Sequence, residues 1–338
     1  MLLLQVLAPW NRFNHLVDRK YEEDFLTLKS LLFLSNKIKM MIDLIDSISD
    51  SKKTERIDEQ YNYCQKISID GQIADVDANW GNVWSAFITN GLCFSEKVVC
   101  KGNVPYLWRE HYYNITEALS KLQLSAYDML QSKDLLRRIE VLCQKNHYPP
   151  YSVVRIIIWL QNEDNKLHYC IIQQRLSKIP YIVNTEKILL TTYEYPLTIT
   201  PFSWIDLPNA FYTIAHNDAK NRNYNGACII NGNNEIITTT LGNLYLIVSQ
   251  YIIGVQYDNG ARRDPIEEYI AKAAEQLGYK FKFLYGGVNM KMLSEAHDCF
   301  VGGTTFGIKP ILGFDTTIRY RRENSLKLAA KFYDLFVY

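Results

Sequence analysis

The amino-acid sequence predicts an α+β fold of two domains with a helical N-terminal extension. Three observations support this prediction: Trp204 to Ile247 has the pattern of a helix followed by two strands, short alternating runs fill residues 66–185, and residues 1–60 have helical periodicity. At 338 residues, the chain can bury a sizeable core and is long enough for about two domains. Its 48% hydrophobic and 22% charged residues are typical of a globular protein.

Residues 1–60 are expected to form a helical extension and a linker. Apolar residues recur at three- and four-residue steps from Tyr21 to Ser49, which predicts an amphipathic helix or a helix pair. The polar run from Ser49 to Glu59 is typical of a linker. We expect this extension to serve packing or a dimer contact.

Residues 66–185 are expected to form a small α+β domain. Lys66 to Gly71 alternates and then turns, and Val98 to Tyr106 reads as a further strand before a helix at Asn114 to Leu124. Val153 to Leu160 and Leu167 to Gln174 predict a buried strand pair around a turn at residues 162–165.

Residues 189–338 are expected to form a larger second domain. Its first helix begins at Pro208, where a missing N–H is tolerated, carries Ala210, Phe211, Ile214 and Ala215 on one face, and ends near Asn221. The following elements are predicted to be strands at 227–230, 235–240 and 245–255, a helix at 265–277 with Asp264 as its N-cap, and a last helix at 325–336.

Composition excludes several classes of function. A net charge of +1 provides no basic surface for nucleic acid or an anionic membrane, and no apolar run is long enough to span a bilayer. The seven cysteines include no C-x-x-C pair, and no His or Asp grouping has the spacing of a metal site. We therefore expect a cytoplasmic protein without a metal.

The stretch from Trp204 to Ile247 resembles a known family. A helix ending in A-x-x-x-x-Y-x-x-A, an apolar strand, a turn, a second strand and G-N-L-Y is similar to the fold-type-IV pyridoxal 5'-phosphate (PLP) enzymes. These are the class IV aminotransferases, including branched-chain and D-amino-acid aminotransferases, and aminodeoxychorismate lyase. The resemblance covers about residues 66 to 330 and implies a larger α/β pseudo-barrel domain at 189–338, a homodimer and an amino-acid-like ligand.

Two segments resemble the phosphate-binding parts of this family. Gly303-Thr304-Thr305 lies in a glycine-rich loop, and Gly260-Ala261-Arg262 precedes a helix start. Free backbone N–H groups and a hydroxyl at such places bind phosphate dianions, so the resemblance assigns Thr304 as the hydroxyl donor. A structural turn between strand and helix explains the same residues equally well.

Two polar positions depart from the family pattern. The family's H-x-x-R-L matches His111 to Ile115, with Asn114 in place of the arginine that contacts phosphate. The family's glutamate, which holds the pyridine nitrogen, matches Thr238, and a threonine cannot stabilise a pyridinium by charge.

The Schiff-base lysine allows two alignments. An ungapped alignment of helix, turn and strand pairs the family's lysine with Ile205, which removes the imine-forming group. A local alignment of Lys220 to Tyr224 with K-x-x-N-Y makes Lys220 that residue, but deletes the helix that follows it in the family. We prefer the first.

Two hypotheses follow from these alignments. In the first, the protein is a diverged family member without Schiff-base chemistry, in which PLP binding is weak or lost. In the second, it is an active PLP-dependent aminotransferase or aminodeoxychorismate-type lyase that uses Lys220. The position of Lys220 relative to the loop at Gly303 to Thr305 discriminates between them, because the aldehyde and phosphate of PLP are a short, fixed distance apart.

Overall fold

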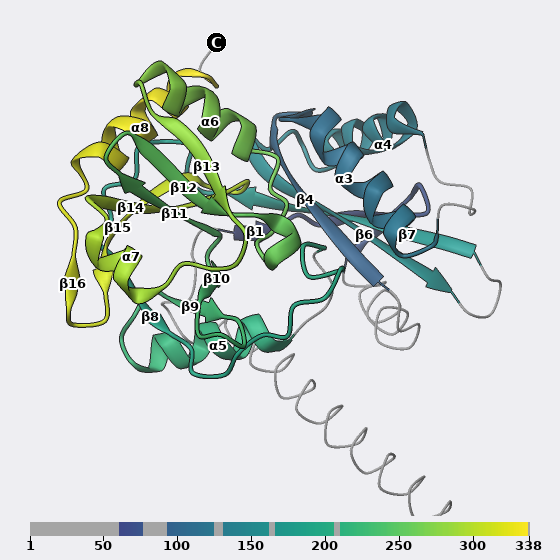
Figure 1. Cartoon of the computed structure of the whole chain (residues 1–338). Helices are drawn as coiled ribbons and strands as arrows, with labels where there is room; N and C mark the ends of the chain where they lie inside the picture. The colour runs from purple at the N-terminus through teal and green to yellow at the C-terminus, as the bar shows by residue number, and fades with distance from the viewer. Residues whose placement is uncertain (1–60, 77–92, 125–130, 162–165, 206–209, 337–338) are drawn as a thin grey trace, which may run out of the picture. The chain divides into compact units, whose positions relative to one another are not determined.

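The computed structural model describes residues 61–76, 93–124, 131–161, 166–205 and 210–336, which all lie within one compact unit, Gln60–Tyr338 (Figure 1). The expected N-terminal helix, the linker, the turn at 162–165 and the helix start at Pro208 lie outside the described residues. The domain boundaries at 66, 185 and 189 stay predictions.

The first sheet is antiparallel throughout and is built from residues up to Leu176. The order of its strands is β3-β2-β7-β6-β4-β5, and β1 pairs with β7. The predicted strand pair is confirmed as its longest hairpin, with Ile156 opposite Ile171. The strands are β1 (Tyr61–Tyr63), β2 (Lys66–Ile69), β3 (Gln72–Asp75), β4 (Cys93–Lys101), β5 (Val104–Pro105), β6 (Tyr151–Gln161) and β7 (Lys166–Leu176).

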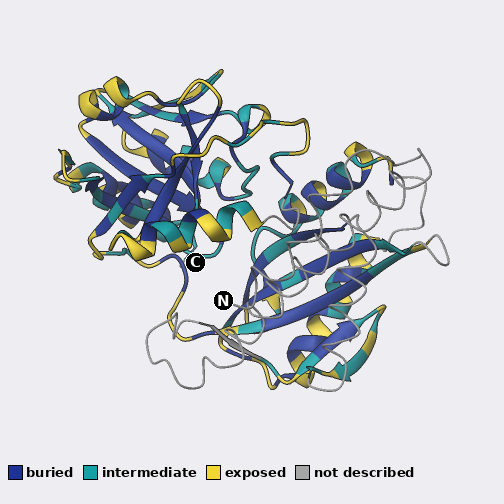
Figure 2. Ribbon diagram, turned by 90° about the horizontal axis from the view of Figure 1, so that it is seen from below, coloured by how far each residue is buried: buried dark blue, intermediate teal, exposed yellow. Residues whose placement is uncertain are grey.

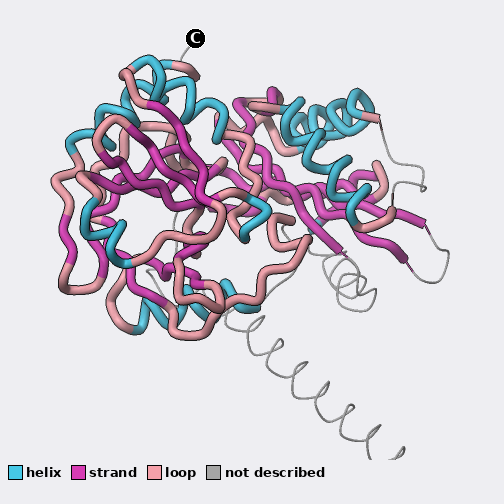
Figure 3. The backbone as a smooth tube through the Cα atoms, viewed as in Figure 1, coloured by secondary structure: helices cyan, strands magenta, loops and turns pink. Residues whose placement is uncertain are grey.

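Two helices, α3 (Trp108–Lys121) and α4 (Ser132–Lys145), pack on this sheet (Figure 3). The buried face of α4 contains Leu135, Ile139 and Leu142, and these side chains share a core with Phe94 and Val98 of β4. We did not predict α4, although its apolar spacing is that of an amphipathic helix. The prediction for α3 was also too short, because the helix begins six residues before Asn114.

The second sheet is mixed, with the order β10-β9-β8-β15-β14-β11-β12-β13 and β16 beside β15. Strand β8 is parallel to both β9 and β15, and β12 is parallel to β13. The strands are β8 (Ile188–Thr192), β9 (Gly226–Ile230), β10 (Ile236–Thr239), β11 (Asn243–Val248), β12 (Tyr251–Val255), β13 (Lys280–Leu284), β14 (Asp298–Gly303), β15 (Gly307–Phe314) and β16 (Ile318–Arg319).

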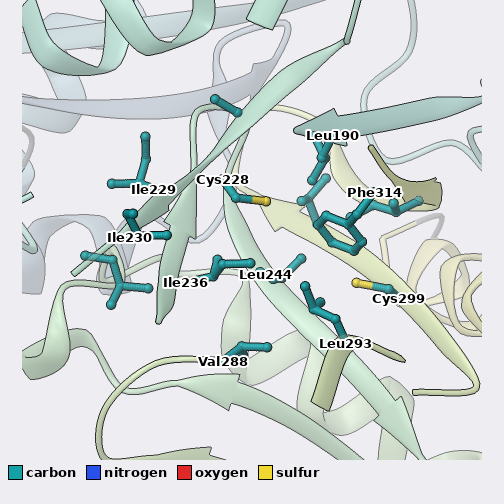
Figure 4. Close-up of a cluster of buried hydrophobic side chains, with 14 of the residues drawn as sticks. Leu190, Cys228, Ile229, Ile230, Ile236, Leu244, Val288, Leu293, Cys299 and Phe314 are labelled. Atoms are coloured by element: carbon teal, nitrogen blue, oxygen red, sulfur yellow. The ribbon is translucent and has the colours of Figure 1, made fainter. Parts of the chain in front are cut away.

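Strand β11 shows how this sheet is covered on both faces. Leu244 and Leu246 belong to the core drawn in Figure 4, whereas Tyr245 and Ile247 point into a second core with α6 and α8. Side chains alternate between the faces of a strand, so an almost continuous apolar run indicates burial on both sides. The buried residues accordingly lie along the central strands (Figure 2). The helices are α5 (Ala210–Asn221), η3 (Tyr257–Asn259), α6 (Glu267–Gln276), α7 (Met290–Glu295) and α8 (Glu323–Asp334).

Three details of this second half differ from the sequence prediction. The predicted strand at 245–255 is a hairpin, because Ser249 takes a left-handed φ of 52° and turns the chain between β11 and β12. Ile214 of α5 is 47% exposed, and the buried face of that helix contains Ala215 and Ala219 instead. Asp264 is not the N-cap of α6, because that helix begins after Ile266.

The seven cysteines are all free thiols. Six of them are buried and only Cys64 is partly exposed. Burial raises the pKa of the Cys170 thiol to about 12, so this group stays protonated at neutral pH. Most of the cysteines therefore act as small apolar side chains, as expected. Among the described helices, none has both the length and the apolar character needed to cross a membrane.

Candidate functional site

A cavity of about 190 Å³ is lined by residues that are far apart in the sequence. Strand β4 and helix α3 form one part of its wall, and the loops before α6 and after β14 form another. Trp204 and Ile205 also line it, and both are buried. The lining residues are Phe94, Ser95, Glu96, Lys97, Asn114, Ala118, Trp204, Ile205, Thr240, Leu241, Gly242, Arg262, Arg263, Asp264, Pro265, Gly303, Thr304, Thr305 and Phe306.

The predicted phosphate loop, Gly303 to Thr305, lies in this wall, but the hydrogen-bond donors of Thr304 are engaged. The Thr304 hydroxyl donates to Asp264 Oδ1 at 2.5 Å, and its backbone N–H donates to Asp264 Oδ2 at 3.0 Å. The N–H of Ile266 also donates to Asp264 Oδ1, at 3.1 Å. A carboxylate of the chain itself therefore takes the donors that sequence analysis assigned to phosphate.

The second predicted phosphate segment contributes only its last residue to the cavity. Gly260 has a φ of 98° and donates its N–H to the carbonyl of Tyr257, and Ala261 is buried. The backbone of Arg262 pairs in both directions with the Asn243 side chain, donating to Oδ1 at 2.9 Å and accepting from Nδ2 at 2.6 Å. Its guanidinium lies 4.7 Å from the centre of the Tyr212 ring.

The three positions that depart from the family pattern occupy different environments. Asn114 lines the cavity and donates from Nδ2 to the carbonyl of Arg263 at 3.2 Å. Ile205 also lines it. Thr238 is fully buried and outside the lining, and its hydroxyl interacts with the carbonyl of Gly242 and with Asn243 Oδ1.

Lys220 lies outside the cavity. It is in the last turn of α5, its side chain is exposed, and it is not among the lining residues. The lysine that does line the cavity is Lys97 of β4. The structure thus brings Gly303, Thr304, Thr305 and Arg262 together, and separates them from Lys220.

Sequence reasoning missed the charged residues of β4. Glu96 lies between Phe94 and Val98 on the face of β4 that packs against α3, and it accepts a 2.5 Å hydrogen bond at Oε1 from His111 Nδ1. Burial raises the pKa of Glu96, and the hydrogen bond from His111 counteracts this. The signal was present, because a charged residue at an apolar position of an alternating strand points to a specific role.

Arg263 was also missed, and it connects α3 to the segment before α6. Its guanidinium forms an ion pair with Glu117 and lies near the rings of Tyr113, Trp204 and Tyr257, at 4.7, 5.7 and 5.2 Å from their centres. This arrangement holds one wall of the cavity against the other. Within the described residues, no group of three or more His, Cys, Asp or Glu side chains is arranged to hold a metal ion.

Solved structures of branched-chain aminotransferases are similar to this chain. The Escherichia coli enzyme matches with a TM-score of 0.68 and 15% identity, covering 81% of this chain and 94% of that one. The enzyme from the archaeon Thermoproteus uzoniensis, solved with norvaline, matches with a TM-score of 0.67 and 15% identity, covering 80% and 93%. A fold IV-transaminase from Curtobacterium pusillum matches at 0.62 and 14%, covering 74% and 87%.

These similarities establish the fold. The chain has the two-sheet α+β fold of the fold-type-IV aminotransferases, as expected from the sequence. No protein-family model and no curated protein matches the sequence.

Proposed function

We propose that this protein is a diverged member of the class IV aminotransferase family whose cavity binds a small amino-acid-like molecule without covalently bound PLP. The observation that carries the proposal is the pairing of Asp264 with both donors of Thr304. The fold and the position of the cavity favour descent from a PLP enzyme, whereas this pairing argues against retention of its cofactor.

The charge of Asp264 is the physical reason. A phosphate needs N–H and O–H donors that are free to point at it, and here Thr304 gives two of them to a carboxylate. A dianion at the same loop would lie beside that negative charge and would be repelled by it. The residues present therefore do not fit the phosphate of PLP.

The lysines support the same conclusion. The preferred alignment leaves apolar Ile205 at the position of the imine-forming lysine, and Ile205 lines the cavity. Lys220, the residue required by the alternative of an active aminotransferase or lyase, has its side chain exposed at the end of α5. An imine at Lys220 would need the cofactor to lie away from the loop at Gly303 to Thr305.

The cavity contains both signs of charge. Arg262 and Lys97 supply cations, and Glu96 supplies a carboxylate, while Phe94 and Leu241 add apolar surface. Such a lining suits a small zwitterion with an apolar part, because each charged end of the ligand meets an opposite charge. An amino-acid-like molecule has this chemistry.

We also propose that the protein is a cytoplasmic homodimer. The seven free thiols support a reducing compartment. The dimer is inferred from the resemblance alone, and light scattering of the purified full-length chain tests it.

The test of the proposed function is reaction of the purified chain with PLP, followed by desalting, an absorption spectrum, borohydride reduction and peptide mapping. We expect no imine band after desalting and no reduced pyridoxyl group on any lysine in stoichiometric amount. The E. coli branched-chain aminotransferase, treated in parallel, serves as the positive control.

A stoichiometric adduct would overturn the proposal, and its position would say how. An adduct on Lys220 that disappears in Lys220→Ala would establish the alternative of an active aminotransferase or lyase. An adduct on Lys97 that disappears in Lys97→Ala would show that β4 supplies the imine lysine instead.

A further inference from the structure

Glu96 is a charged side chain in an apolar layer. Phe94, Val98 and Cys100, which lie on the same face of β4, belong to the core beneath α3 and α4. The residue opposite Glu96 on β6 is Ile156, which is fully buried. Placing a carboxylate in such surroundings is unfavourable unless its charge is compensated, so this residue calls for a specific explanation.

Only one oxygen of Glu96 is used within the described part of the protein. Oε1 accepts from His111 Nδ1 at 2.5 Å and from Asn114 Nδ2 at 3.4 Å, and no described residue donates to Oε2. The side chain is 18% exposed, and Glu96 lines the cavity. A carboxylate can accept about four hydrogen bonds, so Glu96 has capacity left for a donor in the cavity.

His111 holds Glu96 in place and leaves its charge on the carboxylate. The imidazole is 1% exposed, and its Nε2 has no hydrogen-bond partner among the described residues. A buried N–H without an acceptor is more costly than a bare ring nitrogen, which favours the neutral tautomer that donates from Nδ1. The pKa of Glu96 is raised mainly by burial, so its charge is not fully compensated by His111.

The other charged groups around Glu96 have partners of their own. Asp264 accepts from Ile266 and Thr304, Arg263 is paired with Glu117, and Lys97 has an interaction of its own. The guanidinium of Arg262 contacts the Tyr212 ring and is paired with no carboxylate of the described chain. The cavity therefore offers one incompletely satisfied carboxylate and one cation without an acidic partner among the described residues.

We propose that Glu96, held by His111, binds the ammonium group of an α-amino acid whose carboxylate is bound by Arg262, so that the cavity selects amino acids over their oxo and deaminated analogues. This inference rests on the proposed function and adds a selectivity to it. An ammonium group supplies the donors that Oε2 lacks, and an oxo group cannot donate any.

The experiment measures binding of L-leucine, L-alanine and L-glutamate to the full-length chain by calorimetry, beside the 2-oxo acid and the deaminated acid of each. We expect at least one amino acid to bind about tenfold or more tightly than its two analogues, because a hydrogen bond to a charged group contributes about 1.5–3 kcal/mol. Glu96→Gln should abolish this preference while leaving the weaker binding of the analogues unchanged.

Two further measurements separate binding from a merely structural role. Glu140→Gln, an exposed position on α4, is the matched control and should leave the preference intact. Affinity of the wild-type chain for the amino acid should fall as the pH decreases through the raised pKa of Glu96, and Glu96→Gln should remove that part of the pH dependence.

The outcomes distinguish the two proposals. If an amino acid and its oxo analogue bind equally well, or if Glu96→Gln keeps the preference, the role of Glu96 is wrong and the non-covalent cavity stands. If none of the tested molecules binds to the wild-type chain, both the selectivity and the amino-acid-like ligand are wrong.

Discussion

Asp264 joins two loops of the cavity wall through its two oxygens. Replacing it by serine should release the hydroxyl and N–H of Thr304 and remove a negative charge from the loop. We expect Asp264→Ser to lower the free energy of unfolding by about 1–2 kcal/mol and to increase the affinity for inorganic phosphate and PLP. Urea denaturation and calorimetry with phosphate measure the two effects.

The control for this change is Asp258→Ser, an exposed acid in η3 outside the cavity lining. It removes the same charge without freeing Thr304. Equal phosphate affinity in wild type and Asp264→Ser would mean that Asp264 does not prevent anion binding.

Glu267 makes stability depend on pH. Burial raises its pKa to about 7, although the Tyr245 hydroxyl donates a 2.9 Å hydrogen bond to Oε2. A raised carboxyl pKa favours the protonated fold, so this contribution to stability is present below about pH 4.5 and is lost as the pH rises through 7. Glu267→Gln should therefore gain about 1–3 kcal/mol relative to wild type between pH 5 and pH 8.

Urea denaturation at intervals across that pH range measures this difference. Glu268→Gln, at the neighbouring position and with an exposed side chain, should show little change with pH relative to wild type. Parallel curves for wild type and Glu267→Gln would show that Glu267 ionises normally in the fold.

At the scale of elements, the turn between β10 and β11 depends on the small size of Gly242. A Cβ there would lie 2.2 Å from the carbonyl oxygen of Gly302 in β14, and this obstacle is backbone rather than a movable side chain. We expect Gly242→Ala to lower the free energy of unfolding by about 1–3 kcal/mol, because the strands must move apart.

Gly232→Ala is the matched control, since a Cβ at Gly232 meets nothing within 4 Å. Chemical denaturation of both variants gives the comparison. Similar stabilities for the two alanine variants would contradict the close packing of the β10–β11 turn against β14.

The sequence predicted most strands of the second sheet because their apolar runs are long and end at clear turns. It failed at Ser249, where a non-glycine residue in a left-handed conformation splits one apolar run into β11 and β12. It also failed at Asp264, because its local position before Pro265 is that of a helix cap, whereas its partner Thr304 lies 40 residues away. Local patterns predict local structure and carry no information on such a contact.

At the scale of the whole molecule, Arg263 joins segments that are far apart in the chain. It forms an ion pair with Glu117 of α3, and its guanidinium lies near three aromatic rings. Arg263→Met keeps much of the volume but removes the charge and leaves Glu117 without its cation. We expect it to lower the free energy of unfolding by about 1–3 kcal/mol.

Arg222→Met provides the comparison, because Arg222 forms an exposed ion pair with Asp218 on a single helix and such pairs contribute about 0–1 kcal/mol. Thermal unfolding of both variants measures the difference. An Arg263 variant no less stable than the Arg222 variant would show that the ion pair with Glu117 does not tie the two segments together.

The cavity itself could be predicted only in part. The loop at Gly303 to Thr305 was found from its glycines, and Arg262 from its place before a helix, but Glu96 was not found. Its role depends on His111, which approaches from α3, and on Asn114, whose other partner, Arg263, is 149 residues away. These contacts exist only after both sheets have formed.

The burial of six thiols leaves Cys64 as the natural attachment point for a chemical label. A thiol reagent added to the native chain should modify Cys64 first, since a protonated, enclosed sulfur such as that of Cys170 must wait for the structure to open. Fluorophores or cross-linkers can therefore be installed next to the first sheet without mutagenesis. The rate at which the other thiols become reactive reports opening of the cores that contain them.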